Sequence, residues 1–282
     1  MTSALPQRRR FGSAPGSMPG AGWFRWSPVF AGLLIYLVFL IATLPAAVAA
    51  RMLAGWTDNT VRLHRPDGTF WRGSADALII TLPPQQSWRL TAVDWDIVIW
   101  RLVKGEIAAD IRMADAKAPT TATLSYGWGR TRLRDVEAAL PANDTLLAIW
   151  PQLGLWQPGG QFRFATADFS FNANEKVATG DAELRWLNAS TSLSKVNPLG
   201  DYRAAISASG DKADVRVTTL QGALQVEGNG AWSAQRGASF TGTARADAEQ
   251  RAQQREELSD LLKLLGKEQA PGEFRLAFSA TP

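Results

Sequence analysis

The stretch that decides the fold is QFRFATADFSFN, residues 161–172, in which large apolar and polar residues alternate. Phe162 and Phe164 precede a slip at residues 165–167, and Phe169 and Phe171 follow it. In a β-strand successive side chains point to opposite faces, and one extra residue in such a pattern is typical of a β-bulge. The stretch therefore predicts a bulged strand with one aromatic face.

The same alternation continues along the chain. It appears in six further segments of similar length, residues 180–187, 201–208, 213–220, 223–232, 239–246 and 273–279. The connections between them are short, which favours antiparallel pairing because parallel strands need long crossovers. We therefore expect a mainly β domain over residues 51–282, built as a curved, up-and-down antiparallel sheet with a few short helices.

Two helices are expected within this domain. Asn143 or Asp144 could cap a helix over residues 145–153. A second helix, over residues 249–265 and ended by Gly266, carries four leucines on one face, Leu258, Leu261, Leu262 and Leu265. We expect it to dock on the sheet. The alternative is a free amphipathic helix at a membrane, against which its nearly balanced polar face argues.

An uncharged segment precedes the domain. Residues 26–50 contain no charged side chain, and residues 29–44 read VFAGLLIYLVFLIATL. Trp26 and Trp56 are 30 residues apart, or about 45 Å along one helix, which matches a bilayer with its headgroups. Trp23, Trp26 and Trp56 would then lie in the interfacial belts. We predict a transmembrane anchor over residues 26–50. A signal peptide cleaved after Ala47-Val48-Ala49 is the alternative, but its apolar run would be unusually long.

Charge sets the expected orientation. Before Arg51 the charged residues are Arg8, Arg9, Arg10 and Arg25, and such basic residues stay in the cytoplasm. We therefore expect a disordered cytoplasmic tail over residues 1–25 and a C-terminal domain on the far side of the membrane. Of the 30 basic residues, the 26 outside the tail match the 26 acidic ones. A neutral domain lacks the basic face that nucleic-acid binding requires.

Residues that could carry catalysis are few. The chain has no cysteine and one histidine, His64, which lies between arginines and is expected at the surface. Asp94 and Asp96 flank Trp95 and could form a metal pair, but solvated carboxylates are the simpler interpretation. The GWG element at residues 127–129 is too short for a dinucleotide-binding loop. We predict that the chain is not an enzyme and holds no cofactor or metal.

The order of short motifs resembles protein N of the bacterial type II secretion system, the GspN family. The first three are GTFWRGSA at residues 68–75, LTAVDW at residues 90–95 and LVKGEI at residues 102–107. The later ones cover residues 180–186, 199–202, 220–224, 264–266 and 272–276. The resemblance extends from the apolar segment to the end of the chain.

The motif residues have expected structural roles. Glycines permit turns or bulges, and large aromatic side chains supply half-buried surface. We interpret Trp71, between two glycines, as a wedge that fixes the first strand. The residues interpreted as fold determinants are Gly68, Thr69, Trp71, Gly73, Trp95, Gly105, Trp186, Gly200, Tyr202, Gly222, Gly266 and Gly272.

The resemblance implies an accessory or scaffold subunit of the inner membrane that takes part in the export of folded proteins across the outer membrane. Its partners would be the bilayer and other inner-membrane subunits of the secretion system. A second resemblance, at residues 95–111, is to AsmA-like envelope proteins and implies a lipid-binding or lipid-transfer module instead. A continuous, open apolar groove would favour the lipid function, and a filled core would favour the scaffold.

Overall fold

The computed structural model of the chain describes residues 27–82, 86–114, 119–149, 151–233, 235–247 and 252–280. It divides into two compact units, Met1–Thr43 and Leu44–Pro282. The predicted cytoplasmic tail, with Trp23, lies outside the described residues, as does Trp26.

The first unit contains helix α1, Ser27–Ala42. It carries no charged residue, and its large apolar side chains from Val29 to Ile41 are exposed. The helix ends where the hydroxyl of Thr43 donates a 2.8 Å hydrogen bond to the carbonyl oxygen of Phe39. Among the described residues, no helix combines the length and the apolar character that a bilayer crossing needs.

The expected continuous helix over residues 26–50 is in fact interrupted. Helix α2, Ala46–Trp56, begins after Pro45, which has extended backbone angles (φ −67°, ψ 149°), and it belongs to the second unit. Proline has no backbone N–H and is tolerated at a helix start but not in a helix interior. The spacing estimate between Trp26 and Trp56, which assumed one helix, therefore does not apply.

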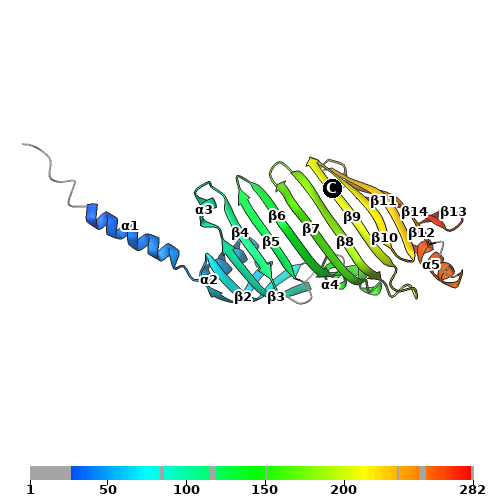
Figure 1. Cartoon of the computed structure of the whole chain (residues 1–282), viewed down its shortest axis with the longest axis horizontal. Helices are drawn as coiled ribbons and strands as arrows, with labels where there is room; N and C mark the ends of the chain where they lie inside the picture. The colour runs from blue at the N-terminus through cyan, green and yellow to red at the C-terminus, as the bar shows by residue number, and fades with distance from the viewer. Residues whose placement is uncertain are drawn as a thin grey trace, which may run out of the picture. The chain divides into compact units, whose positions relative to one another are not determined.

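The second unit is dominated by one antiparallel sheet of 14 strands (Figure 1). Each strand from β1 to β11 pairs with the next along the chain, and the sheet ends in the order β12-β14-β13. The strands are β1 Val61–Gly68, β2 Arg72–Leu82, β3 Gln86–Ile97, β4 Ile107–Met113, β5 Thr120–Gly127, β6 Arg130–Pro141, β7 Gly159–Asn172, β8 Val177–Ser190, β9 Gly200–Gly210, β10 Lys212–Gln221, β11 Leu224–Ser233, β12 Gly237–Ala246, β13 Lys267–Ala270 and β14 Glu273–Ala280. The prediction of a mainly β, up-and-down antiparallel fold is confirmed.

Strand β7 contains the predicted bulge. Its register against β8 shifts between Ala165 and Phe169, and Phe162 and Phe164 pair with Trp186 and Leu184 before the shift. The slip in the sequence pattern therefore marks a real irregularity of the sheet.

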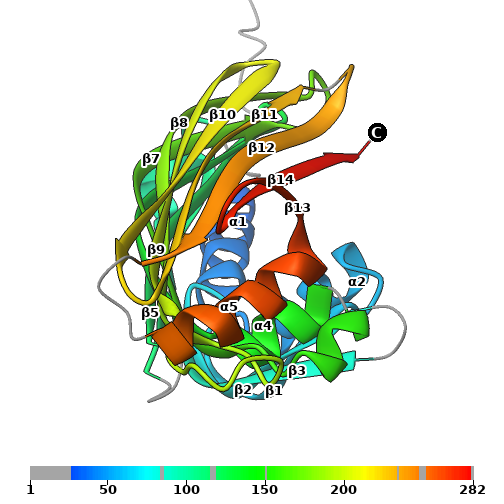
Figure 2. The ribbon, with the colours of Figure 1, turned by 90° about the vertical axis from the view of Figure 1, so that its right-hand side faces the viewer.

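The sheet has one apolar and one polar face. A cross-strand row on the first face joins Phe162, Trp186 and Tyr202. A row three residues further along β7, which points the other way, joins Glu137, Ala165 and Glu183. In Figure 2 the sheet curves, and α2, α4 and α5 all lie on the same side of it.

Helix α4, Ala142–Ile149, differs from the expected helix over residues 145–153. It starts directly after β6, so Asn143 and Asp144 lie in its first turn and do not precede it as caps. A separate 3-10 turn, η2, follows at Pro151–Leu155. Pro151 cannot donate a helical hydrogen bond, so it suits the start of a new turn.

Helix α5, Ala252–Leu265, docks on the apolar face as predicted. Leu258, Leu261 and Leu262 are buried in a cluster with Phe274 of β14 and Leu224 of β11. Complete burial of a leucine contributes roughly 1.5 to 3 kcal/mol. The side chain of Leu265, the fourth predicted member of this face, lies outside the described residues. Another short helix, α3, Ile99–Leu102, connects β3 to β4.

Candidate functional site

The first motif residues lie at the turn between β1 and β2. The indole Nε1 of Trp95 donates a 3.0 Å hydrogen bond to the carbonyl oxygen of Phe70. A β-carbon on Gly73 would collide with the Trp95 ring, so the glycine makes room for the indole. The hydroxyl of Thr69 accepts a 3.1 Å hydrogen bond from the backbone N–H of Arg72 and closes the turn. Gly68, with φ +85°, begins the turn. The structure thus brings Gly68, Thr69, Gly73 and Trp95 together.

Trp71 lies beside this turn and is half-buried. Its ring meets Phe70 edge to face, with centroids 5.0 Å apart, and its carbonyl oxygen accepts a 2.6 Å hydrogen bond from the N–H of Ile97. The indole that fills the gap over a glycine is that of Trp95. Trp95 therefore acts as a wedge at this turn, and the wedge role that the sequence suggested for Trp71 stays a prediction.

A second group of motif residues lies on β8, β9 and the turn before β11. Trp186 packs against Tyr202 with centroids 6.2 Å apart, and its Nε1 donates a 2.9 Å hydrogen bond to the carbonyl oxygen of Gly159. The phenol of Tyr202 donates a 3.0 Å hydrogen bond to the carbonyl oxygen of Leu224, and its burial raises the pKa of Tyr202. Gly200 and Gly222 meet backbone to backbone with no room for a β-carbon.

The other three motif glycines lie apart. Gly105 lies under the ring of Trp128, Gly266 approaches the backbone of Arg275, and Gly272 takes φ +77° in the β13–β14 turn. The motif residues thus form separate structural contacts and are not gathered in one site.

An apolar pocket of about 340 Å³ opens between α5 and the apolar face of the sheet. The Trp186 N–H and the Tyr202 hydroxyl already donate hydrogen bonds to backbone carbonyl oxygens. The wall that they form is therefore apolar. The lining residues are Trp156, Pro158, Trp186, Ser190, Thr191, Leu199, Tyr202, Val217, Leu224, Val226 and Leu261.

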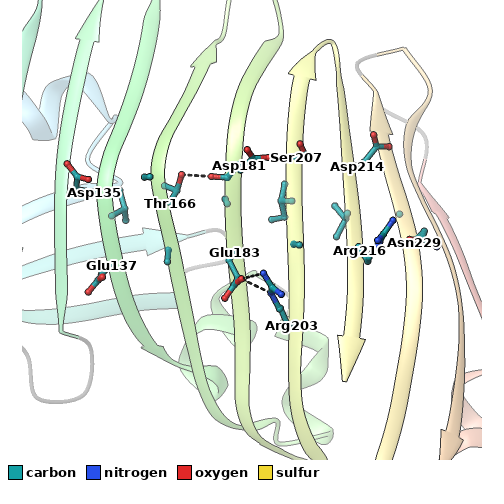
Figure 3. Close-up of a pocket in the computed structure, with 18 of the residues that line it drawn as sticks. Asp135, Glu137, Thr166, Asp181, Glu183, Arg203, Ser207, Asp214, Arg216 and Asn229 are labelled. Carbon is teal, nitrogen blue, oxygen red and sulfur yellow. Dashed lines mark hydrogen bonds and ion pairs between the residues drawn. The ribbon is translucent and has the colours of Figure 1, made fainter. Parts of the chain in front are cut away.

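A polar trough of about 1220 Å³ lies along the other face, across β5 to β11. Figure 3 shows its side chains, and cross-strand pairing explains why they line up. Glu183 pairs with Ala205, which pairs with Arg216, which in turn pairs with Asn229. The residues labelled in the figure are Asp135, Glu137, Thr166, Asp181, Glu183, Arg203, Ser207, Asp214, Arg216 and Asn229.

The Glu183 carboxylate in this trough is bonded by two arginines. Arg203 contacts its Oε2 through Nε at 2.6 Å and Nη2 at 2.5 Å, and Arg185 bonds its other oxygen. Desolvation alone would raise the pKa of Glu183, but the hydrogen bonds and charges of Arg185 and Arg203 outweigh it and hold the pKa below its ordinary value. The carboxylate therefore remains ionised and orients both guanidinium groups.

The other residues considered from the sequence do not assemble a reactive site. Asp96 bonds Arg72, with Oδ2 2.6 Å from Nη2, while Asp94 and His64 are exposed. Within the described ranges no three histidine, cysteine, aspartate or glutamate side chains cluster to hold a metal ion.

Neither the trough nor the pocket was predicted from the sequence. Both depend on which residues of different strands become neighbours. The available signal was the alternation of charged residues at 183, 185, 203 and 216 with apolar residues between them, but the register that aligns them is set by long-range pairing.

The fold and its two hollows define an open-sheet β protein with a polar face and an apolar face. The sequence matches the family model described as type II secretion system (T2SS), protein N, over residues 59–277. The chain therefore belongs to this family, which confirms the resemblance drawn from its motifs. Searches of curated proteins and of solved structures each found no match.

Proposed function

We propose that this chain is a non-enzymatic, membrane-anchored scaffold subunit of the type II secretion system, with its sheet domain in the periplasm. Membership of the protein N family is the observation that carries this proposal. Other inner-membrane subunits of the same machine are its proposed partners. Cofactors and nucleic acid have no part in the function.

The anchor is argued from α1. All its large apolar side chains from Val29 to Ile41 are at least 42% exposed. An uncharged helix with such a surface is stable in a lipid environment and costly in water. The four arginines before it favour a cytoplasmic N-terminus.

The scaffold role is argued from the trough. Its walls present carboxylates, guanidinium groups and the Asn229 amide on adjacent paired strands, which suits charge-complementary recognition of another protein. Arg216 is exposed in this trough and offers a group to test.

The experiment uses a secreting strain that lacks the chain and is complemented with the full chain. We expect complementation to restore export, and Arg216→Glu to reduce it at equal protein level. Arg62→Glu, on an exposed residue of β1 outside the trough, is the matched control. Full export without the chain would contradict the scaffold role, and equal export by both variants would contradict the use of the trough.

Orientation is tested separately. The chain has no cysteine, so Leu155→Cys introduces one thiol at a residue that is 85% exposed. We expect a membrane-impermeant maleimide to label it once the outer membrane is opened. Labelling only after the inner membrane is broken would contradict a periplasmic domain.

A lipid-binding module is the second candidate, and the apolar pocket under α5 favours it. Part of the apolar face is filled by α5, yet Phe164, Leu184 and Ile206 beyond it remain half-buried. A pocket of this size and character fits part of one hydrocarbon chain.

The lipid function is tested by filling the pocket. Val217→Trp would occupy it, whereas Leu193→Trp, on an exposed residue outside the pocket, would not. Mass spectrometry of lipids that copurify with each full-length variant should show a loss specific to Val217→Trp. Equal lipid content in both variants would reject this function.

A further inference from the structure

Six exposed apolar side chains lie in and beside two connections, the one between β3 and β4 and the one between β5 and β6. We call this set the aromatic tip. Trp100, Val103 and Trp128 are 82%, 82% and 86% exposed. The other three members, Ile99, Ile107 and Tyr126, are 53%, 42% and 54% exposed. Figure 1 shows α3, which carries Ile99 and Trp100, at the strand ends opposite those beside α4 and α5.

The two turns of the tip touch each other. Ile107 of β4 pairs with Tyr126 of β5. The ring of Trp128 lies against Gly105, so close that a β-carbon there would be 3.4 Å from the indole. The tip is therefore one continuous surface. Clustered exposed apolar groups of this kind mark interaction sites, whereas single ones do not.

Trp128 is a costly residue for its turn. Gly127 and Arg130 are paired, so Trp128 and Gly129 form a two-residue hairpin loop, with φ +54° and +75°. Such loops prefer Asn-Gly, since asparagine tolerates positive φ better than a bulky side chain does. At 86% exposure Trp128 gains little from burial in compensation. Strain of this kind at an exposed residue points to a role in binding.

The charges of the tip favour a particular partner. Its turns, residues 99–106 and 127–130, carry three basic residues, Arg101, Lys104 and Arg130, and one acidic residue, Glu106. Glu106 is offset by Arg101, whose Nη1 lies 3.8 Å from its carboxylate. Lys104 and Arg130 are exposed. Tryptophan and tyrosine beside lysine and arginine are typical of protein surfaces at the headgroup level of a bilayer with acidic lipids.

The position of the tip supports the same partner. Leu44, the first residue of the sheet unit, accepts a 2.7 Å hydrogen bond from the N–H of Phe70. The next residue, Trp71, accepts one from Ile97, two residues before α3. The chain thus enters the sheet unit at the strand ends that carry the aromatic tip.

We propose that the aromatic tip inserts into the headgroup region of an acidic phospholipid bilayer and holds this end of the sheet against the membrane. The choice of the bilayer as partner rests partly on the membrane anchor proposed above. The exposure, the strain and the charge of the tip are independent of the anchor.

The test uses the full chain, reconstituted in vesicles of phosphatidylethanolamine and phosphatidylglycerol. Because the chain has no cysteine, Val103→Cys accepts one environment-sensitive fluorophore, and a spin-labelled lipid serves as quencher. Leu155→Cys is the matched control, since it is 85% exposed and lies beyond the opposite end of β6. We expect several-fold stronger quenching at Val103 than at Leu155. Equal quenching at the two positions, or none at Val103, overturns the proposal.

A third label separates this proposal from the anchor. Leu37→Cys reports on α1. Quenching at Leu37 without quenching at Val103 rejects the tip and keeps the anchor, and the reverse keeps the tip and rejects the anchor. If the label at Val103 is shielded only when other secretion subunits are added, the partner of the tip is a protein. That result would overturn the proposal.

Trp128→Asn distinguishes binding from a structural role. Asparagine suits the hairpin loop, so we expect an unfolding midpoint that is unchanged or higher, together with a several-fold loss of quenching at Val103. Trp128→Tyr, which retains an interfacial aromatic group, should retain most of the quenching. A lower midpoint for Trp128→Asn with unchanged quenching would show that the residue serves the fold and overturn its proposed role.

Discussion

Gly73 and Trp95 are paired across β2 and β3, and the indole of Trp95 occupies the space where a side chain on Gly73 would lie. The same indole bonds the carbonyl oxygen of Phe70. Three segments, namely the β1–β2 turn, β2 and β3, thus depend on one aromatic residue. This contact explains why a glycine and a tryptophan lie 22 residues apart in the first two motifs of the chain.

Gly73→Ala is expected to destabilise the sheet unit. An added methyl group must displace the Trp95 ring, and overpacking of this kind costs about 1 to 3 kcal/mol. Chemical denaturation followed by circular dichroism measures the effect. Gly55→Ala is the control, because nothing lies within 4 Å of the position its β-carbon would take in α2. Equal midpoints for the two variants would contradict the close contact.

Leu258→Ala is expected to loosen α5 from the sheet. Leu258 is 0% exposed and packs in the cluster that includes Phe274. Removing a buried leucine side chain costs about 2 to 5 kcal/mol. The unfolding midpoint measures the loss, with Lys263→Ala, on the exposed side of the same helix, as control. If both substitutions shift the midpoint equally, α5 does not contribute through this cluster.

The strands were predictable because their signal is local. In residues 161–172 each aromatic residue reports the face on which it lies, and the slip reports the bulge. The leucines of α5 are likewise spaced for one helix face, so its docking followed from the sequence. Short connections were sufficient to predict the order of neighbouring strands.

The hollows were not predictable because they depend on register. Nothing near Glu183 in the sequence shows that Arg203 and Arg216 will share its face, since 20 or more residues separate them. The break between α1 and α2 is different, because Pro45 was a visible signal. The segment is apolar along its whole length, and hydropathy alone does not distinguish one helix from two. The break was therefore not predicted.

The ion cluster around Glu183 predicts a pH dependence. The folded-state pKa of Glu183 lies below its ordinary 4.5, so the unfolded chain takes up the proton more readily than the folded protein does. The stabilisation is therefore complete above the unfolded pKa and is lost as the pH falls through the folded pKa. We expect Glu183→Gln to be less stable than the unsubstituted protein near neutral pH, with the difference shrinking below pH 4.5. Denaturation midpoints across this range measure it. A constant difference at all pH values would contradict the role of ionised Glu183.

Leu37→Arg tests the proposed anchor. Leu37 lies in the middle of the uncharged α1 and is 48% exposed, so its side chain would face lipid. An arginine at the centre of an inserted helix costs about 2.5 to 3.5 kcal/mol on the insertion scale. We expect a large share of the variant to be lost from the membrane fraction after carbonate extraction. Leu155→Arg, which places the same charge at an exposed residue of the sheet unit, should remain in the membrane fraction like the unsubstituted chain. Because both variants carry the same added charge, a loss seen for both would point to misfolding or degradation. Full membrane recovery of Leu37→Arg would show that α1 does not hold the chain in the bilayer.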